Sequence, residues 1–110
     1  MRFYIVIPAH NEEAFIKNCL ISLSEQTLLP KKIIVVDDNS SDKTPKIVEA
    51  LKNQYAFIDI VQHQSSEKHL PGEKIISAFY KGFDQLDNEY DVICKFDADL
   101  IFPKDYLKSI

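Results

Sequence analysis

Four short apolar runs, separated by segments with helical spacing, constrain the fold of this chain more than any other feature. The runs cover residues 3–7, 33–36, 57–61 and 90–96 and are rich in β-branched and aromatic residues. Short runs that stay apolar are typical of strands buried on both faces of a sheet. Because these runs alternate with helical segments, the sequence predicts the element order β-α-β-α-β-α-β-α.

The segments between the runs carry apolar residues spaced as on one face of a helix. The first places them at i, i+1, i+4, i+5 and i+8 from Phe15 to Leu23, and the third repeats this spacing from Ile75 to Phe83. The first helix is expected to end near Gln26. The predicted helix starts, in chain order, are Asn11 as an N-cap, Thr44 as an N-cap followed by Pro45, Gly72, and Pro103.

This alternation predicts an α/β fold with a doubly wound, mainly parallel sheet and helices on both faces. With the strands numbered in chain order, the simplest arrangement is 3-2-1-4, which is Rossmann-like. In that order the winding reverses between strands 1 and 4, and ligands bind beyond the carboxyl ends of the strands at such a switch point. We expect residues 1–110 to form one unit.

Acidic and polar residues follow three of the predicted strands and should meet at that switch point. Residues 8–12 follow the first strand, Asp37 and Asp38 end the second, and Asp97 and Asp99 follow the fourth. Carboxylates crowded into one crevice repel one another, and a divalent cation relieves the repulsion. Mg²⁺ and Mn²⁺ prefer carboxylate and phosphate oxygens. The pattern therefore predicts a phosphate-containing ligand held together with a metal ion.

The glycine content limits how a phosphate could be held. The chain has only Gly72 and Gly82, so it contains neither a GxGxxG segment nor a Walker A loop. Metal and side chains must then hold the phosphate instead of a backbone cradle. An acidic, glycine-poor site with an Asp-x-Asp segment is the design expected of an enzyme that uses a nucleotide sugar.

Three segments together resemble the family 2 glycosyltransferases of GT-A fold. Residues 5–13 read Ile-Val-Ile-Pro-Ala-His-Asn-Glu-Glu, residues 35–42 read Val-Val-Asp-Asp-Asn-Ser-Ser-Asp, and residues 97–99 read Asp-Ala-Asp. They match the family's P-x-x-N-E start, its V-V-D-D-x-S-x-D second strand and its D-x-D segment, in the same order. The resemblance extends over residues 3–99.

This resemblance implies a nucleotide-diphospho-sugar donor, often a uridine nucleotide, and a role for each matching residue. The segment from Pro8 to Glu12 walls the base and ribose pocket, and one carboxylate of the Asp37–Asp38 pair accepts a hydrogen bond from the base. Asp97 faces the ribose or a metal-bound water, and Asp99 ligates Mg²⁺ or Mn²⁺. Lys74 is the basic residue nearest the diphosphate, although Ala78-Phe79-Tyr80 departs from the family's usual Ala-Arg-Asn. The implied nucleotide-contacting residues are Pro8, Ala9, His10, Asn11, Glu12, Asp37, Asp38, Lys74 and Asp97.

The resemblance also implies what this chain lacks. Complete members continue after the D-x-D segment with an acceptor-binding half that carries the catalytic base, and they transfer the sugar to an acceptor hydroxyl with inversion. We therefore expect residues 1–110 to be the donor half of a GT-A domain that is inactive alone. A non-catalytic module that only binds nucleotide sugars remains the alternative.

Charge and composition exclude several other classes of protein. The formal net charge is −4, from 13 basic and 17 acidic residues, which is a poor match for nucleic acid. No apolar run approaches the roughly 20 residues that span a bilayer. Cys19 and Cys94 are expected to be reduced thiols, which favours a cytoplasmic location, with the full-length protein at the cytoplasmic face of a membrane. Exposed apolar surface leaves self-association open.

Two further interpretations are less favoured by the positions of the residues. A phospho-receiver domain needs an acidic pair after its first strand and an aspartate after its third, whereas Gln62 and His63 follow the third run here. His63 and His69 could suggest a metal pair, but they fall in a predicted polar loop at residues 63–71 without a third ligand. Both are therefore expected to be solvated.

Overall fold

The sheet of this protein is parallel and has four strands in the order β3-β2-β1-β4. The structure, a computed structural model, describes residues 1–64 and 71–110. The α/β fold with strand order 3-2-1-4 predicted from the sequence is confirmed. The strands are β1 (Phe3–Ala9), β2 (Lys32–Asp38), β3 (Ile58–His63) and β4 (Val92–Lys95).

Strand β1 lies in the middle of the sheet, and its two neighbours pair with it over different lengths. β2 pairs with β1 from Tyr4 to Ala9, whereas β4 pairs with it from Phe3 to Val6. After Phe96, whose N–H donates to the Val6 carbonyl, the chain turns away from the sheet. This divergence at the carboxyl end of β1 creates the crevice expected at a switch point between neighbouring strands.

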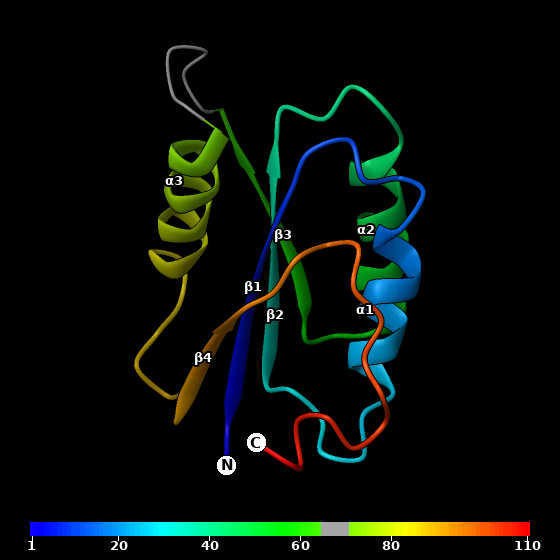
Figure 1. The fold of residues 1–110 in the computed structure, drawn as a ribbon, viewed down its shortest axis with the longest axis vertical. Helices are drawn as coiled ribbons and strands as arrows, with labels where there is room; N and C mark the ends of the chain where they lie inside the picture. Colours follow the sequence, from blue (N-terminus) through cyan, green and yellow to red (C-terminus); the bar gives the residue numbers. More distant parts are fainter. Residues whose placement is uncertain (65–70) are drawn as a thin grey trace.

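Helices cover both faces of the sheet (Figure 1). α1 (Ile16–Ser24) and α2 (Thr44–Gln54) lie on one face, and α3 (Pro71–Phe83) lies on the other. The larger apolar core, which includes Ile5 and Ile33, is buried on the α1 and α2 side. A smaller core beneath α3 contains Val6, Ile34, Val36 and Ala78. Alternate residues of each strand thus enter opposite cores, as the pleat requires.

Gly82 allows α3 to pack unusually close to the sheet. A Cβ atom at this position would lie 2.7 Å from Val6 Cγ1 and 2.8 Å from Val36 Cγ2. Both contacts are shorter than carbon atoms tolerate, so the absence of a side chain sets the distance between helix and sheet. The position of α3 matters for function because this helix forms one wall of the crevice described below.

The predicted N-cap role of Asn11 is wrong. α1 begins at Ile16, and Phe15 is its N-cap residue without a side-chain capping bond. Asn11 instead adopts φ 51°, and its Oδ1 accepts a hydrogen bond from the Ser41 N–H at 2.8 Å. The side chain is therefore committed to a neighbouring loop. The other predicted boundaries are off by one or two residues: α1 ends at Ser24, Thr44 is the first residue of α2, and α3 begins at Pro71.

The short helix predicted from Pro103 is also wrong, because residues 104–109 form turns. Buried Gln26 uses both of its polar atoms on this segment. Its Nε2 donates to the Pro103 carbonyl at 2.5 Å, and its Oε1 accepts from the Leu107 N–H at 3.0 Å. The Thr27 N–H donates to the Lys104 carbonyl at 2.9 Å. The Leu107 N–H is therefore committed to Gln26, just after α1, and is not available for a helical bond to the Pro103 carbonyl, which accepts from the Tyr106 N–H at 3.1 Å as in a turn.

The region between β3 and α3 was predicted as a polar loop over residues 63–71. His63 is the last residue of β3, and its Nε2 lies 2.9 Å from Ser77 Oγ on α3. The interpretation of His69 falls outside the described residues. Within the part of the chain that the structure describes, no helix is long and apolar enough to cross a membrane.

Candidate functional site

A cavity of about 670 Å³ opens at the carboxyl edge of the sheet, between the end of β1, the end of β2, α3 and the segment after β4. Its position follows from the early divergence of β4 from β1. The predicted site residues that line it are Pro8, Ala9, His10, Glu12, Asp38, Lys74, Asp97 and Asp99. Segments that lie up to 91 positions apart in the sequence are thereby brought to one place.

Two predicted site residues, Asn11 and Asp37, lie outside the lining that the described residues form. Asp37 is only 2% exposed, and one of its carboxylate oxygens, Oδ1, is buried without a hydrogen-bond partner among the described residues. Neighbouring residues of a strand point to opposite faces, so Asp38 faces the α3 side, where the cavity lies, and Asp37 faces the α1 and α2 side. Of the aspartate pair, Asp38 is therefore the one that reaches the cavity.

The cavity is also lined by four residues that were not predicted as site residues from the sequence: Asn39, Ile75, Ala78 and Ala98. The signal for two of them was present in the sequence. Lys74 and Ala78 are one helical turn apart, so a helix that presents Lys74 to a cavity presents Ala78 as well. Ala98 lies between the two predicted aspartates.

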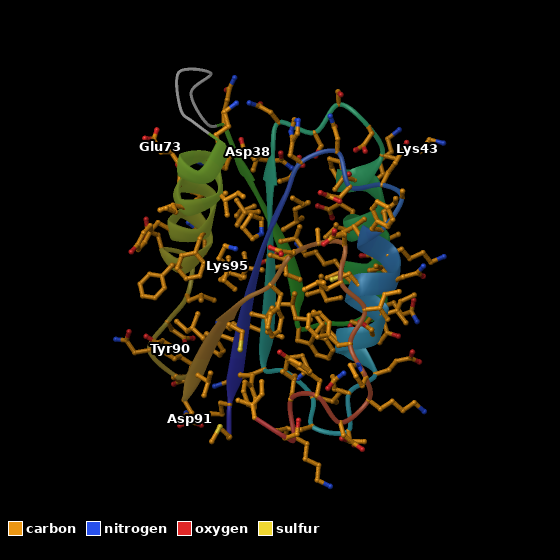
Figure 2. The ribbon with its side chains drawn as sticks, viewed as in Figure 1. Asp38, Lys43, Glu73, Tyr90, Asp91 and Lys95 are labelled. Atoms are coloured by element: carbon orange, nitrogen blue, oxygen red, sulfur yellow. The ribbon has the colours of Figure 1, made fainter. Side chains whose placement is uncertain are left out.

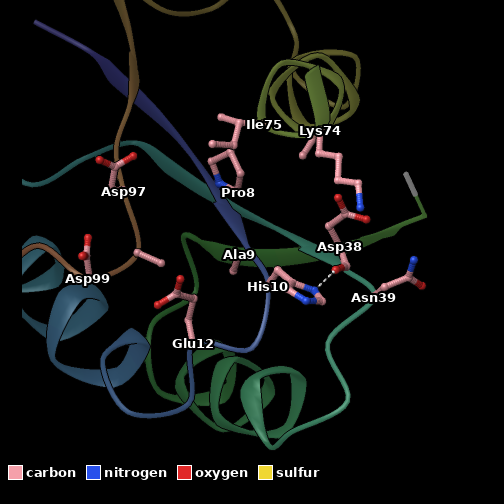
Figure 3. Close-up of a pocket in the computed structure, with 12 residues that line it drawn as sticks. Pro8, Ala9, His10, Glu12, Asp38, Asn39, Lys74, Ile75, Asp97 and Asp99 are labelled. Carbon is pink, nitrogen blue, oxygen red and sulfur yellow. Dashed lines mark hydrogen bonds between the residues drawn. The ribbon is translucent and has the colours of Figure 1, made fainter. Parts of the chain in front are cut away.

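Charge is distributed unevenly around the cavity (Figure 3). Glu12, Asp97 and Asp99 lie on the side next to the segment after β4, whereas Asp38 lies on the opposite side. The side chain of Lys74 extends from α3 toward Asp38. One half of the cavity is therefore acidic, and the other half offers both a cation and a carboxylate.

The His10 ring is held in a defined orientation. Its Nδ1 lies 2.6 Å from the Asp38 carbonyl oxygen, which can only accept, so Nδ1 carries the proton in this contact. Asn11 Nδ2 lies 3.4 Å from His10 Nε2, which fits Nε2 as the acceptor. These two contacts orient the ring and tie the end of β1 to the end of β2.

The acidic half of the cavity shows the repulsion that the sequence predicted. Partial burial, followed by the nearby charges of Asp99 and Asp42, raises the pKa of Glu12, and the His10 ring opposes this. Beneath the same region, burial and then the charge of Asp99 raise the pKa of the Cys19 thiol to about 12. Cys19 Sγ donates to the Asp97 carbonyl at 3.7 Å. A cation at this side of the cavity would relieve the strain between the carboxylates.

The carboxylates do not form a preassembled metal site. Among residues 1–64 and 71–110, no group of three or more histidine, cysteine, aspartate or glutamate side chains could hold a metal ion. Asp97 is mostly exposed and pairs with Lys95 at 3.6 Å. The donor types still suit Mg²⁺ or Mn²⁺, because hard cations select carboxylate oxygens and usually take further oxygens from a bound phosphate.

Comparison with known proteins identifies the family. The profile of the family described as "Glycosyl transferase family 2" matches residues 4–110. This chain belongs to glycosyl transferase family 2. The resemblance drawn from the three sequence segments is thereby confirmed, and the cavity at the carboxyl edge of the sheet is a feature of a family 2 glycosyltransferase domain.

Relatives and solved structures support the same assignment. The chain is 40% identical over 98 residues to the probable glycosyltransferase YdaM of Bacillus subtilis, covering 86% of this chain and 22% of that protein. It superposes on Staphylococcus aureus TarS 1–349 in complex with UDP with a TM-score of 0.78 and 29% identity, covering 99% of this chain and 30% of that one.

A third similar protein carries a metal ion. Glucosyl-3-phosphoglycerate synthase from Mycobacterium tuberculosis, in complex with Mn²⁺, UDP and glucosyl-3-phosphoglycerate, superposes with a TM-score of 0.66 and 27% identity. That match covers 93% of this chain and 35% of the synthase. The family 2 chain described here therefore spans between about a fifth and about a third of the length of these relatives.

Proposed function

We propose that this chain binds a nucleotide-diphospho-sugar donor, in which the nucleotide is a uridine nucleotide, in the cavity at the carboxyl edge of its sheet. The observation that carries the proposal is the convergence there of Pro8 to His10, Asp38 and the Asp97–Asp99 segment. The size of the cavity, about 670 Å³, falls within the usual range for small-molecule sites. The similarity to TarS in complex with UDP supports uracil as the base.

Each lining residue has a role that follows from its chemistry. Asp38 accepts a hydrogen bond from an N–H group of the base, and the segment from Pro8 to Glu12 walls the base and ribose. Lys74 lies near the diphosphate, where its ammonium group offsets negative charge. Asn11 and Asp37 belong to the same segments but do not line the cavity, so their roles in binding are indirect.

A divalent cation completes the proposed site. Asp99, together with Asp97, would hold Mg²⁺ or Mn²⁺ through carboxylate oxygens. Burial, and then the charges of Asp99 and Asp42, raise the pKa of Glu12 beside them. When bound, such a cation stabilises the negative charge of the diphosphate leaving group. Mn²⁺ in the structure of glucosyl-3-phosphoglycerate synthase supports this part of the proposal.

In the complete protein we propose transfer of the sugar to an acceptor hydroxyl with inversion. The acceptor oxygen forms a bond to the anomeric carbon as the bond to the diphosphate oxygen breaks, and a base takes the hydroxyl proton. The residues described here bind and orient the donor for that step. Since the chain spans 22% of YdaM and 30% of TarS 1–349, we expect the 110 residues alone to bind the donor without transferring it.

Isothermal calorimetry of UDP binding with and without Mn²⁺ tests the proposal directly. We expect wild-type protein to bind UDP more tightly with Mn²⁺, and Asp99→Ala to lose that enhancement. Asp105→Ala, which removes an exposed aspartate outside the cavity lining, is the matched control and should behave as wild type. No binding in either condition would reject the site, and an unchanged Mn²⁺ effect in Asp99→Ala would reject its role as ligand.

A turnover measurement on the isolated chain and on the complete protein distinguishes a donor half from a non-catalytic module. Turnover of UDP-sugar, measured as release of free UDP, should be absent from the isolated chain and present in the complete protein. A complete protein that binds the donor and never releases UDP would favour the alternative of a non-catalytic nucleotide-sugar-binding module.

We also propose that the complete protein acts at the cytoplasmic face of a membrane, which fractionation of cells would test.

Self-association is the last part of the proposal. Three large side chains of α3, Ile76, Tyr80 and Phe83, are exposed by 57%, 58% and 38%. We call these three residues the outer face of α3. Apolar side chains gathered on one helix favour contact with another protein surface, and we propose a second copy of this chain as the partner.

A further inference from the structure

Two loops that build one side of the cavity are tied to each other by hydrogen bonds that do not face the cavity. The first loop, residues 10–15, connects β1 to α1, and the second, residues 39–43, connects β2 to α2. Asn11 stands at the centre of this connection. Its Oδ1 accepts from the Ser41 N–H at 2.8 Å, from Ser41 Oγ at 3.4 Å and from the Asp42 N–H at 3.4 Å.

The Asn11 backbone takes part as well. Its N–H donates to Ser40 Oγ at 2.9 Å, and its φ of 51° places it in the left-handed region. Asparagine is among the few residues other than glycine that adopt this region readily. The backbone conformation turns both the amide N–H and the side chain of Asn11 toward the second loop, away from the α1 helix it precedes.

Further contacts continue the connection along both loops. The Glu12 N–H donates to Thr44 Oγ1 at 2.9 Å, and the Glu13 N–H donates to Asp42 Oδ2 at 3.1 Å. Asp42 Oδ1 in turn accepts from the Thr44 N–H at 2.9 Å. We call the set formed by Asn11, Ser41, Asp42 and Thr44 the loop clamp.

The loop clamp holds residues that line the cavity without lining it itself. His10 and Glu12 lie on either side of Asn11, and Asp38 and Asn39 precede Ser41. Of the four clamp residues, all described in the structure, none belongs to the cavity lining. Figure 3 shows His10, Glu12 and Asp38 converging on the cavity from the ends of β1 and β2. The spacing between these side chains therefore depends on how the two loops are fixed to each other.

We propose that Asn11 is a positioning residue for nucleotide binding. Through the loop clamp it fixes the loop that carries His10 and Glu12 against the loop that follows Asp38, so that the base and ribose wall exists before the ligand arrives. A wall that is ordered in advance spares the ligand the entropic cost of ordering it, and affinity rises accordingly. This inference rests on the proposed function, because it assigns Asn11 to the same donor site.

Two substitutions at Asn11 separate its hydrogen bonds from its backbone conformation. Asn11→Gly keeps access to the left-handed region and removes the acceptor, whereas Asn11→Asp keeps both. We expect Asn11→Gly to bind UDP about tenfold more weakly, which corresponds to the loss of one or two net hydrogen bonds. We expect Asn11→Asp to stay within about threefold of wild type by the same scale.

Amide hydrogen exchange of Ser41 and Asp42 provides a readout that needs no ligand. Both amides should exchange faster in Asn11→Gly than in wild type, and Asn11→Asp should restore their protection. Tyr4→Phe is the matched stability control, since Tyr4 donates to Asp87 at the opposite end of the sheet. Figure 2 shows that end through its neighbours Tyr90 and Asp91, far from Asp38. Tyr4→Phe should lower the melting temperature and leave UDP affinity unchanged.

The outcomes separate this inference from the proposed function. Wild-type protein that does not bind UDP would overturn the proposed function and this inference with it. Wild-type protein that binds UDP while Asn11→Gly binds equally well would overturn the positioning role alone. Unchanged exchange of Ser41 and Asp42 in Asn11→Gly, or an equal affinity loss in Tyr4→Phe, would do the same.

Discussion

Tyr4 shows how single residues fasten the end of the sheet that lies away from the cavity. Its ring is fully buried, and its hydroxyl donates to the Asp87 carboxylate. The Lys32 ammonium lies 5.3 Å from the centroid of the Tyr4 ring and 3.0 Å from Asp87 Oδ2. One carboxylate thus links β1, β2 and the segment before β4, and we expect its ionisation to contribute to stability.

The first prediction concerns the pH dependence of this contact. Hydrogen bonds from Tyr4, from the Glu89 N–H and from Lys32 hold the pKa of Asp87 well below its ordinary value of 3.8. A depressed folded-state pKa means that the stabilisation is present above that ordinary value and is lost as the pH falls below it. Asp87→Asn should therefore lower the melting temperature at pH 7, and the difference from wild type should shrink between about pH 4 and pH 2.

Thermal melts of both proteins across this pH range check the prediction. Tyr4→Phe removes the hydrogen bond that lowers the pKa of Asp87 most, so it should reduce the same pH dependence. A difference between wild type and Asp87→Asn that is as large at pH 2 as at pH 7 would show that the charge of Asp87 does not contribute.

At the scale of elements, the packing of α3 on the sheet gives the second prediction. Gly82→Ala would place a methyl group 2.7 Å from Val6 Cγ1. Overpacking of this kind costs about 1–3 kcal/mol, which outweighs the gain of about 1 kcal/mol expected from alanine in a helix. We expect chemical denaturation to show a net loss of stability. Lys81→Ala, one residue away, is the control, and a Gly82→Ala protein more stable than wild type would contradict the packing argument.

The third prediction concerns the attachment of the C-terminal turns to α1. Gln26 is 3% exposed and bonds to Ser22, Pro103 and Leu107. Gln26→Ala leaves the buried Leu107 N–H without its partner, whereas the Pro103 carbonyl still accepts from the Tyr106 N–H. The unpaired N–H should cost about 1–3 kcal/mol in the free energy of unfolding.

Denaturation together with hydrogen exchange of the Leu107 amide measures this effect. The neighbouring substitution Thr27→Ala removes an exposed hydroxyl that contacts Asp105, and it should cost less than about 1 kcal/mol. Equal losses for the two substitutions would contradict the special role of the buried amide.

Element type and order could be predicted from the sequence, because the apolar runs and helical spacing report burial directly. Two predictions failed: the start of α1 at Asn11 and the helix from Pro103, where residues 104–109 form turns instead. Asn11 has the composition of an N-cap, yet its side chain bonds to Ser41, a residue 30 positions away. Pro103 has the composition of a helix start, yet its carbonyl accepts from Gln26. Local propensity carries no information about such distant partners.

Most of the residues that line the candidate site could also be predicted from the sequence. Topology alone brings the ends of β1 and β2 and the segment after β4 together, so most lining residues follow from the strand order. Neighbouring residues of a strand point to opposite faces of the sheet, so only one of Asp37 and Asp38 can face the cavity. Two adjacent aspartates do not reveal which one does. Ile75 required knowledge of which face of α3 turns toward the cavity, whereas Ala78 follows from its spacing to Lys74.

At the scale of the whole molecule, the fourth prediction concerns self-association through the outer face of α3. Sedimentation velocity should show a weight-average mass that rises with protein concentration. Tyr80→Ser together with Ile76→Ser should weaken association at least about tenfold, because apolar burial contributes about 25 cal/mol per Å². Ile101→Ser, which removes a side chain that is 69% exposed elsewhere, is the control. A monomer at all concentrations would reject the proposal.

The central position of β1 has a consequence for the order in which the chain can fold during synthesis. β1 pairs with β2 about 30 residues later, but its other neighbour, β4, starts at Val92. A nascent chain can therefore assemble β1, β2 and β3 with α1 and α2, and with them the loop clamp, while β4 is still unmade. One wall of the cavity forms early, and the wall with Asp97 and Asp99 closes only when almost all of these 110 residues have left the ribosome.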